Sequence, residues 1–194
     1  DGVYLNIVSR EDDVLTAPHY TDMLRNIELA GRTCYKSERR MTPTSGRQFV
    51  KMLMERGHEA MLEHGGTITV KFICDRGVSH QLVRHRLFSF AQESTRYCRY
   101  KDGIQVIVPT SLPEDQYETF TMAMLVAEDA YLKLLKAKVP AEIARAVLPT
   151  AVKTEVIVSG NPRQWRQFFK LRCAADAHPD IRQLSKAILA EFAT

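Results

Sequence analysis

The chain has 194 residues, 45% of them hydrophobic and 26% charged, which is ordinary for a folded globular protein and short for two domains. Its net charge of +4 suits a protein that handles anionic small molecules and does not demand nucleic acid. No apolar run could span a bilayer, and four scattered cysteines without CxxC spacing or a secretory segment predict a reducing, cytoplasmic setting.

The first third of the chain is predicted to be mostly helical. Alternating apolar residues over 3–9 predict a strand, and apolar residues at helical spacing over 20–35 predict a helix. A second helix is expected from residue 44 to a break at Gly57, followed by a short turn that ends at residues 65–66.

The middle of the chain alternates between strand and helix signals. Residues 66–75 have a period of two, which places four side chains on one face of a strand: Ile68, Val70, Phe72 and Cys74. A helical pattern follows from Gly77 to about Arg86, and residues 104–109 predict another strand.

A long amphipathic helix is predicted next. Ser111 and Glu114 have the spacing of a capping box that introduces this helix. Pro140 opens a shorter helix that ends near Leu148, and residues 151–160 predict a strand.

Two helices led by prolines are predicted at the end of the sequence. Asn161 is expected to cap the first, with Pro162 at its first position and Gln164 at its third. Pro179 begins the second, whose buried stripe is Ile181, Leu184, Ile188 and Phe192. Without a linker, repeat or composition break, residues 1–194 predict one α+β domain with few strands and many helices.

The common nucleotide and metal motifs are missing from the sequence. It has no GxGxxG after a strand and no GxxxxGK[ST]. His58 and His64, in HEAMLEH, are six residues apart. At ~3.6 residues per helical turn these two side chains would point apart rather than share a metal ion, so we predict no metal site.

The segment QLVRHRLFSFAQESTRY concentrates cations. If residues 79–86 are helical, Gln81, Arg84 and His85 share one face and Arg86 points elsewhere. Two guanidinium forks aimed in different directions fit two separate anionic groups. Further polar donors, typical of a loop around a phosphate or a base edge, follow at Gln92, Ser94, Thr95 and Arg96.

A solvated basic face is the alternative interpretation of this segment. Against it, apolar residues are interleaved with the cations, and Glu93 is the only nearby acid. The apolar residues are Leu82, Val83, Leu87, Phe88, Phe90 and Tyr97. Buried arginines need partners, and the least costly partner here is a ligand, so the segment favours a site for anions.

A second candidate region is NPRQWRQFFKLR. Helical spacing puts three aromatic side chains on a stripe that ends at Arg172: Trp165, Phe168 and Phe169. For Arg172, the alternative role is a cation that complements the helix macrodipole. Arg163 and the backbone N–H groups near Asn161 form an anion-binding helix start, and Arg145 is a cation just before a helix stop.

These segments resemble the flavin-dependent thymidylate synthases. RHR, seven residues and then Ser, in RHRLFSFAQES, is similar to the signature of that family. The segments AGRTCY, GHEAMLEH, QLVRHR, STRY, ARAVLP and NPRQW…FFKLR follow in the family's order over about residues 25–182. A lone RHR would be weak evidence, whereas the ordered set is specific.

The resemblance implies a homotetramer that binds FAD without a Rossmann domain and has its active sites at subunit interfaces. It implies methylation of dUMP at C5, with methylenetetrahydrofolate as one-carbon donor and NADPH as the reductant of the flavin. By similarity, the FAD contacts are His58, Glu63, Arg84, His85, Arg86, Gln92, Asn161, Arg163 and Gln167. The dUMP contacts are Gln81, Arg84, Gln92, Ser94, Thr95, Arg96, Arg145 and Arg172.

Within this set, Arg172 matches the catalytic residue that favours ionisation of the uracil at N3. Ser94 is expected to bind phosphate rather than act as a nucleophile, because no adjacent base is evident to activate it. The cysteines are expected to be structural.

Two other functions stay open. A small nucleic-acid-binding domain would use the cations between residues 76 and 101, although balanced charge elsewhere and the core-like order of the aromatic residues disfavour it. Those cations are Arg76, Arg84, Arg86, Arg96, Arg99 and Lys101. The other possibility is a flavoprotein of the same fold that acts on a different pyrimidine nucleotide.

Overall fold

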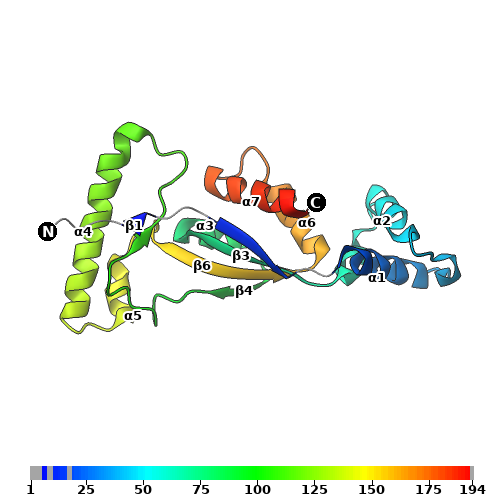
Figure 1. Cartoon of the computed structure of the whole chain (residues 1–194), viewed down its shortest axis with the longest axis horizontal. Helices are drawn as coiled ribbons and strands as arrows, with labels where there is room; N and C mark the ends of the chain where they lie inside the picture. The colour runs from blue at the N-terminus through cyan, green and yellow to red at the C-terminus, as the bar shows by residue number, and fades with distance from the viewer. Residues whose placement is uncertain (1–5, 8–10, 17–18, 193–194) are drawn as a thin grey trace.

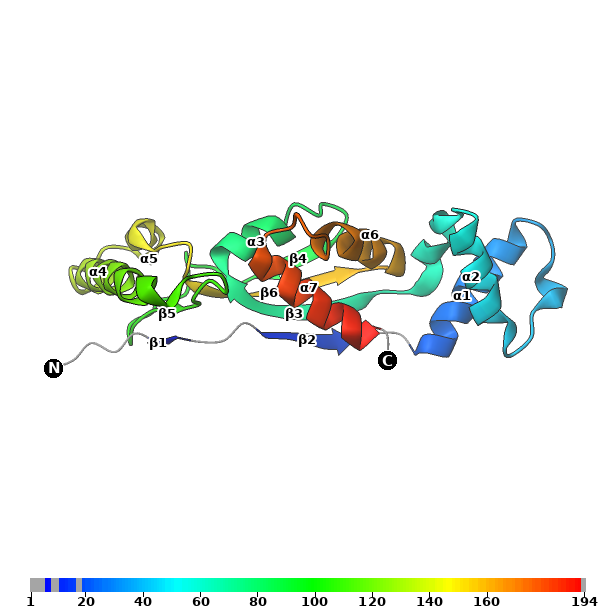
Figure 2. The same cartoon turned by 90° about the horizontal axis from the view of Figure 1, so that it is seen from above.

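The structure is a computed structural model that describes residues 6–7, 11–16 and 19–192. Figure 1 shows an elongated molecule in three parts, with a β-sheet in the centre and a group of helices at either end. The view from above shows the same three parts along the long axis (Figure 2). The predicted α+β class is confirmed.

The central sheet has the strand order β2–β3–β6–β4, and every neighbouring pair is antiparallel. Its strands are β2 (Glu11–Thr16), β3 (Ile68–Asp75), β6 (Lys153–Gly160) and β4 (Ser89–Gln92). β3 and β6 pair along their full lengths, with Ile68 opposite Gly160 and Asp75 opposite Lys153. A separate parallel pair joins β1 (Asn6–Ile7) to β5 (Gln105–Val106).

One face of the sheet is covered by helices, and Figure 1 shows α6 and α7 on the same side. The covering helices are α3 (Arg76–Leu82), α6 (Pro162–Arg172) and α7 (Pro179–Phe192). The alternation predicted for β3 is confirmed, because all four predicted side chains are buried on this face. Trp165 of α6 stacks near Phe72 and donates a 3.1 Å hydrogen bond to the Ile68 carbonyl.

The burial of these large apolar side chains contributes about 1.5–3 kcal/mol each to stability. This core therefore holds α6 firmly against the sheet. The buried stripe predicted for α7 is confirmed at Ile181, Leu184 and Ile188, while Phe192 is partly buried. Arg172, the last residue of α6, is positioned by this packing.

The predicted start of α6 is also confirmed. The Gln164 N–H donates to Asn161 Oδ1 over 3.0 Å, and the Asn161 N–H donates to Gln164 Oε1 over 2.7 Å. This reciprocal capping box satisfies two backbone donors at the helix start, with Pro162 at the first position. Gln164 Nε2 donates to the Leu87 carbonyl over 2.8 Å and so joins α6 to the turn after α3.

The helical group at one end of the sheet follows the predicted pattern. It contains α1 (Tyr20–Thr33), the 3₁₀ turn η1 (Glu38–Arg40), α2 (Ser45–Glu55) and the 3₁₀ turn η2 (Glu59–Gly65). The predicted break at Gly57 is confirmed, and its φ of 71° explains why glycine is suited there. A small core of Ile27, Val50, Leu53 and Leu62 holds the group together.

The group at the opposite end surrounds a long helix. It contains η3 (Glu114–Gln116), α4 (Tyr117–Lys136), α5 (Ala141–Ala144) and η4 (Arg145–Val147). The predicted cap at Ser111 is wrong, because α4 begins at Tyr117 and no side chain caps it. Pro113 is the reason: it holds an extended backbone (φ −61°, ψ 144°), so the helix cannot start before it.

Two predictions around the basic segment are also wrong. The helix predicted to reach Arg86 ends at Leu82, and a turn follows. Residues 89–92, predicted as part of a loop, form β4, because the open edge of β6 offers them a partner from Ser89–Ser159 to Gln92–Val156.

Two predicted strands are only partly described or are shorter than expected. The strand predicted over 3–9 is described only at Asn6–Ile7, and its remaining residues lie outside the described part of the chain. The strand predicted over 104–109 shortens to Gln105–Val106. A single bridge from Val106 to Val152 joins it to the segment before β6.

Within the described part of the chain, no helix combines the length and apolar character needed to cross a membrane. The same residues contain no group of three or more side chains that could hold a metal ion. Of the cysteines, Cys34 and Cys98 are exposed, Cys173 is partly buried and Cys74 is buried in the core of the sheet.

Candidate active site

The C-terminal end of α6 meets the C-terminal end of α3 through Arg172. Its Nε donates to His85 Nε2 over 2.9 Å, and its two terminal nitrogens donate to the side-chain oxygen and the carbonyl of Gln81 over 3.2 and 3.1 Å. All three acceptors are neutral. The half-buried guanidinium is therefore held in place while its positive charge stays uncompensated.

His85 owes its protonation state to its surroundings. Its ring packs edge-on against Phe168, with centroids 5.0 Å apart, and against Phe88 at 6.2 Å. Burial and, second, the charge of Arg172 lower the pKa of His85 to about 4. The ring is therefore neutral near pH 7, and because Nε2 accepts from Arg172, its proton lies on Nδ1. Burial also lowers the pKa of Arg172.

Arg84 and Arg86 lie in the turn after α3, and both are exposed. The expectation that these arginines are half-buried among apolar side chains is wrong. The helix ends at Leu82, and both side chains are exposed in the turn that follows. Within the described residues, neither side chain has an acidic partner. Two exposed, uncompensated forks fit the phosphates of a dinucleotide such as FAD.

Gln81 and His85 share a partner as expected for the predicted common face, although a turn rather than a helix brings them together. Arg84, the third predicted member of that face, is exposed and does not contact Arg172. Two of the three residues predicted to share one face therefore contact Arg172.

Gln92 contacts residues other than those that hold Arg172. It ends β4, and its side-chain amide donates to Ser79 Oγ over 2.9 Å and to Thr154 Oγ1 over 3.2 Å. Ser79 and Thr154 were not predicted as site residues. Nothing in the sequence around them marks them, because they meet Gln92 only through the pairing of the strands, in which Thr154 lies opposite Cys74.

A second group of predicted site residues gathers between the turn after β4 and α5. Arg145 donates to Thr95 Oγ1 over 3.4 Å and to the Glu142 carbonyl over 3.2 Å. Arg96 is exposed and pairs with Glu142 over 2.8 Å. Ser94 Oγ accepts from the Arg96 N–H at 3.3 Å. This group presents two guanidiniums and two hydroxyls, a donor set suited to a phosphate.

A third group lies where η2 meets the start of α6. Arg163 forms an ion pair with Glu63, and Asn161 caps the helix. His58 is exposed just before η2, and Gln167 lines the groove between α6 and α1. The groove that contains Gln167 is lined by neither Arg145 nor Arg172.

Comparison with known proteins identifies the family of the chain. Residues 18–194 match the family model described as thymidylate synthase complementing protein. The chain is 38% identical to a flavin-dependent thymidylate synthase of Geobacter sulfurreducens over 88% of this chain and 78% of the relative. It is 36% identical to the Corynebacterium glutamicum relative of the same name, over 82% and 71%. The chain belongs to the flavin-dependent thymidylate synthase family.

Membership makes the protein a methyltransferase of thymidylate synthesis and implies a flavin cofactor, FAD. The exposed Arg84 and Arg86 fit such a cofactor, as noted above. The resemblance predicted from the RHR segment is therefore confirmed.

The fold of this flavin-dependent thymidylate synthase family member is shared by a solved structure. A UMP/dUMP methylase, PolB from Streptomyces cacaoi, bound with 5-Br dUMP, matches with a TM-score of 0.82 over 97% of this chain and 92% of that chain. The two sequences are 24% identical, so the likeness concerns the fold.

Proposed function

We propose that this enzyme converts dUMP to dTMP, with methylenetetrahydrofolate as the one-carbon donor and NADPH as the reductant. The single observation that carries the proposal is the arrangement of Arg172, a guanidinium held by neutral Gln81 and His85 at the end of a buried aromatic stripe. FAD, when bound, supplies the hydride chemistry that the side chains lack.

Arg172 is the catalytic residue in this proposal. Methylation at C5 requires the uracil ring to become electron-rich, and a fixed cation near N3 and its adjacent carbonyl stabilises the negative charge that develops there. Arginine suits this role because it remains charged without exchanging protons. The neutral partners orient the guanidinium without neutralising its charge, so that the charge can act on the uracil ring.

The substrate phosphate is assigned to the second group of residues. Ser94 and Thr95 contribute hydroxyls, and Arg96 and Arg145 contribute charge. Gln81 and Gln92 offer amides to the base, while Arg84 reaches both substrate and cofactor. Ser94 has no adjacent base in the described structure, which supports a binding rather than a nucleophilic role.

The cofactor is assigned to the turn after α3 and to the third group. Arg84 and Arg86 bind its phosphates, and His85 orients the segment through Arg172. The remaining contacts are His58, Glu63, Gln92, Asn161, Arg163 and Gln167. Arg163 is paired with Glu63 through one guanidinium nitrogen, and its other N–H groups remain available to the cofactor.

The protein acts as a homotetramer of single-domain chains, with residues 1–194 as one domain and active sites at subunit interfaces. The separation of the predicted site residues into three groups supports this, because another subunit is then needed to complete each site. The exposed thiols of Cys34 and Cys98 support the cytoplasmic location that we propose.

One experiment tests the proposal directly. Purified protein is expected to be yellow or to take up FAD, and to form dTMP from dUMP when NADPH and methylenetetrahydrofolate are supplied. Colourless protein that binds no FAD would defeat the proposal. Methylation of UMP in place of dUMP would assign a different substrate, and salt-dependent DNA binding without nucleotide affinity would favour the nucleic-acid alternative.

A further inference from the structure

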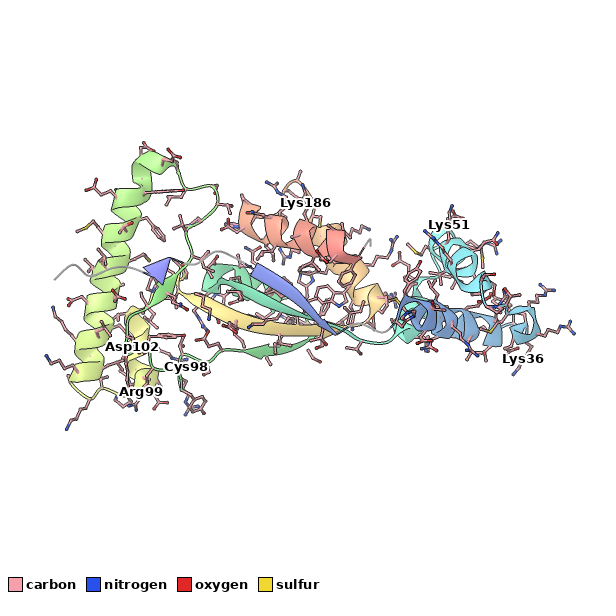
Figure 3. All side chains as sticks on the ribbon, viewed as in Figure 1. Lys36, Lys51, Cys98, Arg99, Asp102 and Lys186 are labelled. Carbon is pink, nitrogen blue, oxygen red and sulfur yellow. The ribbon has the colours of Figure 1, made fainter. Side chains whose placement is uncertain are left out.

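A basic groove lies at the end of the molecule that carries α1 and α2. It has a volume of about 640 Å³ and an apolar floor that includes Phe49, Met52 and Leu53. Its rim carries the cations Arg32, Lys36, Arg39, Arg40 and Arg56, and His58 lies at one side. None of the described residues that line it is acidic. Figure 3 shows Lys36 at the outer tip of this end.

Helix ends explain only part of this charge. α1 and α2 both end at the groove, and each helix C-terminus is equivalent to roughly −0.5 of a charge, so about one cation would neutralise the pair. Arg32 is already paired with Glu28 over 2.7 Å. Lys36, Arg39, Arg40 and Arg56 are exposed, and within the described residues their side chains have no acidic partner. A surplus of positive charge therefore remains.

Lys36 lies at the rim of the groove just after the end of α1. Its φ of 49° is left-handed, a conformation that follows many helices and is usually taken by glycine. A lysine there costs roughly 1–2 kcal/mol. The same conformation occurs at Lys138 beside α4 (φ 62°), so it marks the end of a helix and does not by itself indicate a ligand.

We propose that this groove binds the aminobenzoyl-glutamate part of the tetrahydrofolate donor, and that its cations hold a chain of γ-linked glutamates. The inference rests on the proposed function, which places His58 beside the flavin and so locates the reacting end of the folate. An apolar floor with a cationic rim fits an aromatic ring that carries several carboxylates.

The test compares the tetrahydrofolate donor carrying one glutamate with the donor carrying three. The variant is Arg39→Ala with Arg40→Ala, since both side chains are exposed and removing them should leave the fold intact. The control removes the same charge at Arg99 and Lys101, which line a groove beside α4. Figure 3 shows Arg99 at the opposite end of the molecule from Lys36.

In the unaltered holoenzyme, KM for the triglutamate donor is expected to be about tenfold below that for the monoglutamate. The Arg39/Arg40 variant should lose most of this preference, with kcat, the KM for dUMP and FAD binding unchanged, and the Arg99/Lys101 variant should keep it. Equal KM values for the two donors in the unaltered enzyme would overturn the proposal, and so would a rise in the KM for NADPH alone.

A binding measurement separates this proposal from the proposed function. Calorimetry with aminobenzoyl-triglutamate as the probe is expected to show binding to the holoenzyme that weakens with salt and with the Arg39/Arg40 substitutions. If dTMP is not formed but this binding persists, the assigned reaction fails and the groove remains an oligocarboxylate site. Absence of binding, with dTMP formation intact, rejects the groove alone.

Discussion

The guanidinium of Arg172 donates from Nε to Nε2 of His85 over 2.9 Å, a contact between the end of α6 and the turn after α3. The two residues are 87 positions apart in sequence, yet each determines the state of the other. Arg172 helps to keep the imidazole neutral, and the neutral imidazole in turn orients the guanidinium. A cation held in this way keeps its charge available to an anionic ligand, which is the role that we propose for it toward the pyrimidine.

The first prediction concerns Arg172→Ala. This substitution should leave FAD binding largely intact and lower kcat by at least about 10²–10³-fold, since a fixed charge at the reacting ring is lost. Arg172→Lys restores the charge without the fork and should recover only part of the rate. Stopped-flow measurement of dTMP formation and a flavin titration distinguish the two effects. A variant that lost FAD but kept the turnover of its residual holoenzyme would contradict the assignment.

The second prediction concerns Arg86→Ala. Because Arg86 is exposed and without an acidic partner among the described residues, its removal should leave the fold unchanged and weaken FAD about tenfold. At saturating FAD, kcat should approach that of the unaltered enzyme. Arg99→Ala removes an equally exposed arginine far from the turn and should leave FAD affinity unchanged. An unchanged FAD titration for Arg86→Ala would remove this residue from the cofactor site.

The elements that the sequence predicted well are those whose signals are local. The capping box of Asn161 and Gln164 and the alternation along β3 depend on neighbours within a few residues. The missed cap at Ser111 was a local error, since Pro113 was visible and disfavours helical backbone at Leu112, the residue that would follow the cap. The strand at 89–92 was missed for a different reason, because only its pairing with β6 makes it a strand.

The candidate site shows the same division. The RHR segment and Arg172 were predicted as site residues from the sequence, but their contact was not, because it depends on where α3 ends and how α6 packs. Interleaved apolar residues suggested buried arginines, whereas Leu87 is 81% exposed and Arg84 and Arg86 lie beside it in solvent. Burial within a turn cannot be deduced from composition alone.

The third prediction follows from the pKa of His85, which is lowered to about 4 from an ordinary value of 6.5. Above pH 6.5 the ring is neutral in both folded and unfolded chains, and the folded state keeps its full stability. As the pH falls from 6.5 toward 4, the unfolded chain binds the proton first, so the free energy of unfolding decreases. Allowing for the partial exposure of the ring, the loss should be about 1–2 kcal/mol.

His85→Gln isolates this effect, since glutamine can still accept from Arg172 but does not titrate. Urea unfolding at pH 7.5 and at pH 4.5 should show a smaller loss of stability for His85→Gln than for the unaltered protein. His80→Gln replaces an exposed histidine on the same helix and should leave the loss as it is. Identical pH dependence in all three proteins would mean that His85 is not the titrating group.

The fourth prediction separates two roles of Asn161. Asn161→Ala removes the side-chain acceptor of the capping box and should cost about 1 kcal/mol of stability. Asn161→Asp keeps an acceptor at the same place and should restore that stability. The aspartate also brings a negative charge toward the cofactor phosphates, so it should still weaken FAD. Equal FAD affinity in Asn161→Asp and the unaltered protein would limit Asn161 to its structural role.

The fifth prediction concerns the ion pair of Arg96 and Glu142, whose side chains are 55% and 46% exposed. An exposed pair of this kind contributes little to stability, about 0.2–1 kcal/mol, so it breaks at small cost when a better anion arrives. If that anion is the dUMP phosphate, Glu142→Gln removes a competitor and should lower the KM for dUMP about two- to threefold. Arg96→Ala should raise it about tenfold, with FAD binding unchanged in both variants. A higher KM for dUMP in Glu142→Gln would contradict the competition. It would show instead that Glu142 positions Arg96 to bind the phosphate.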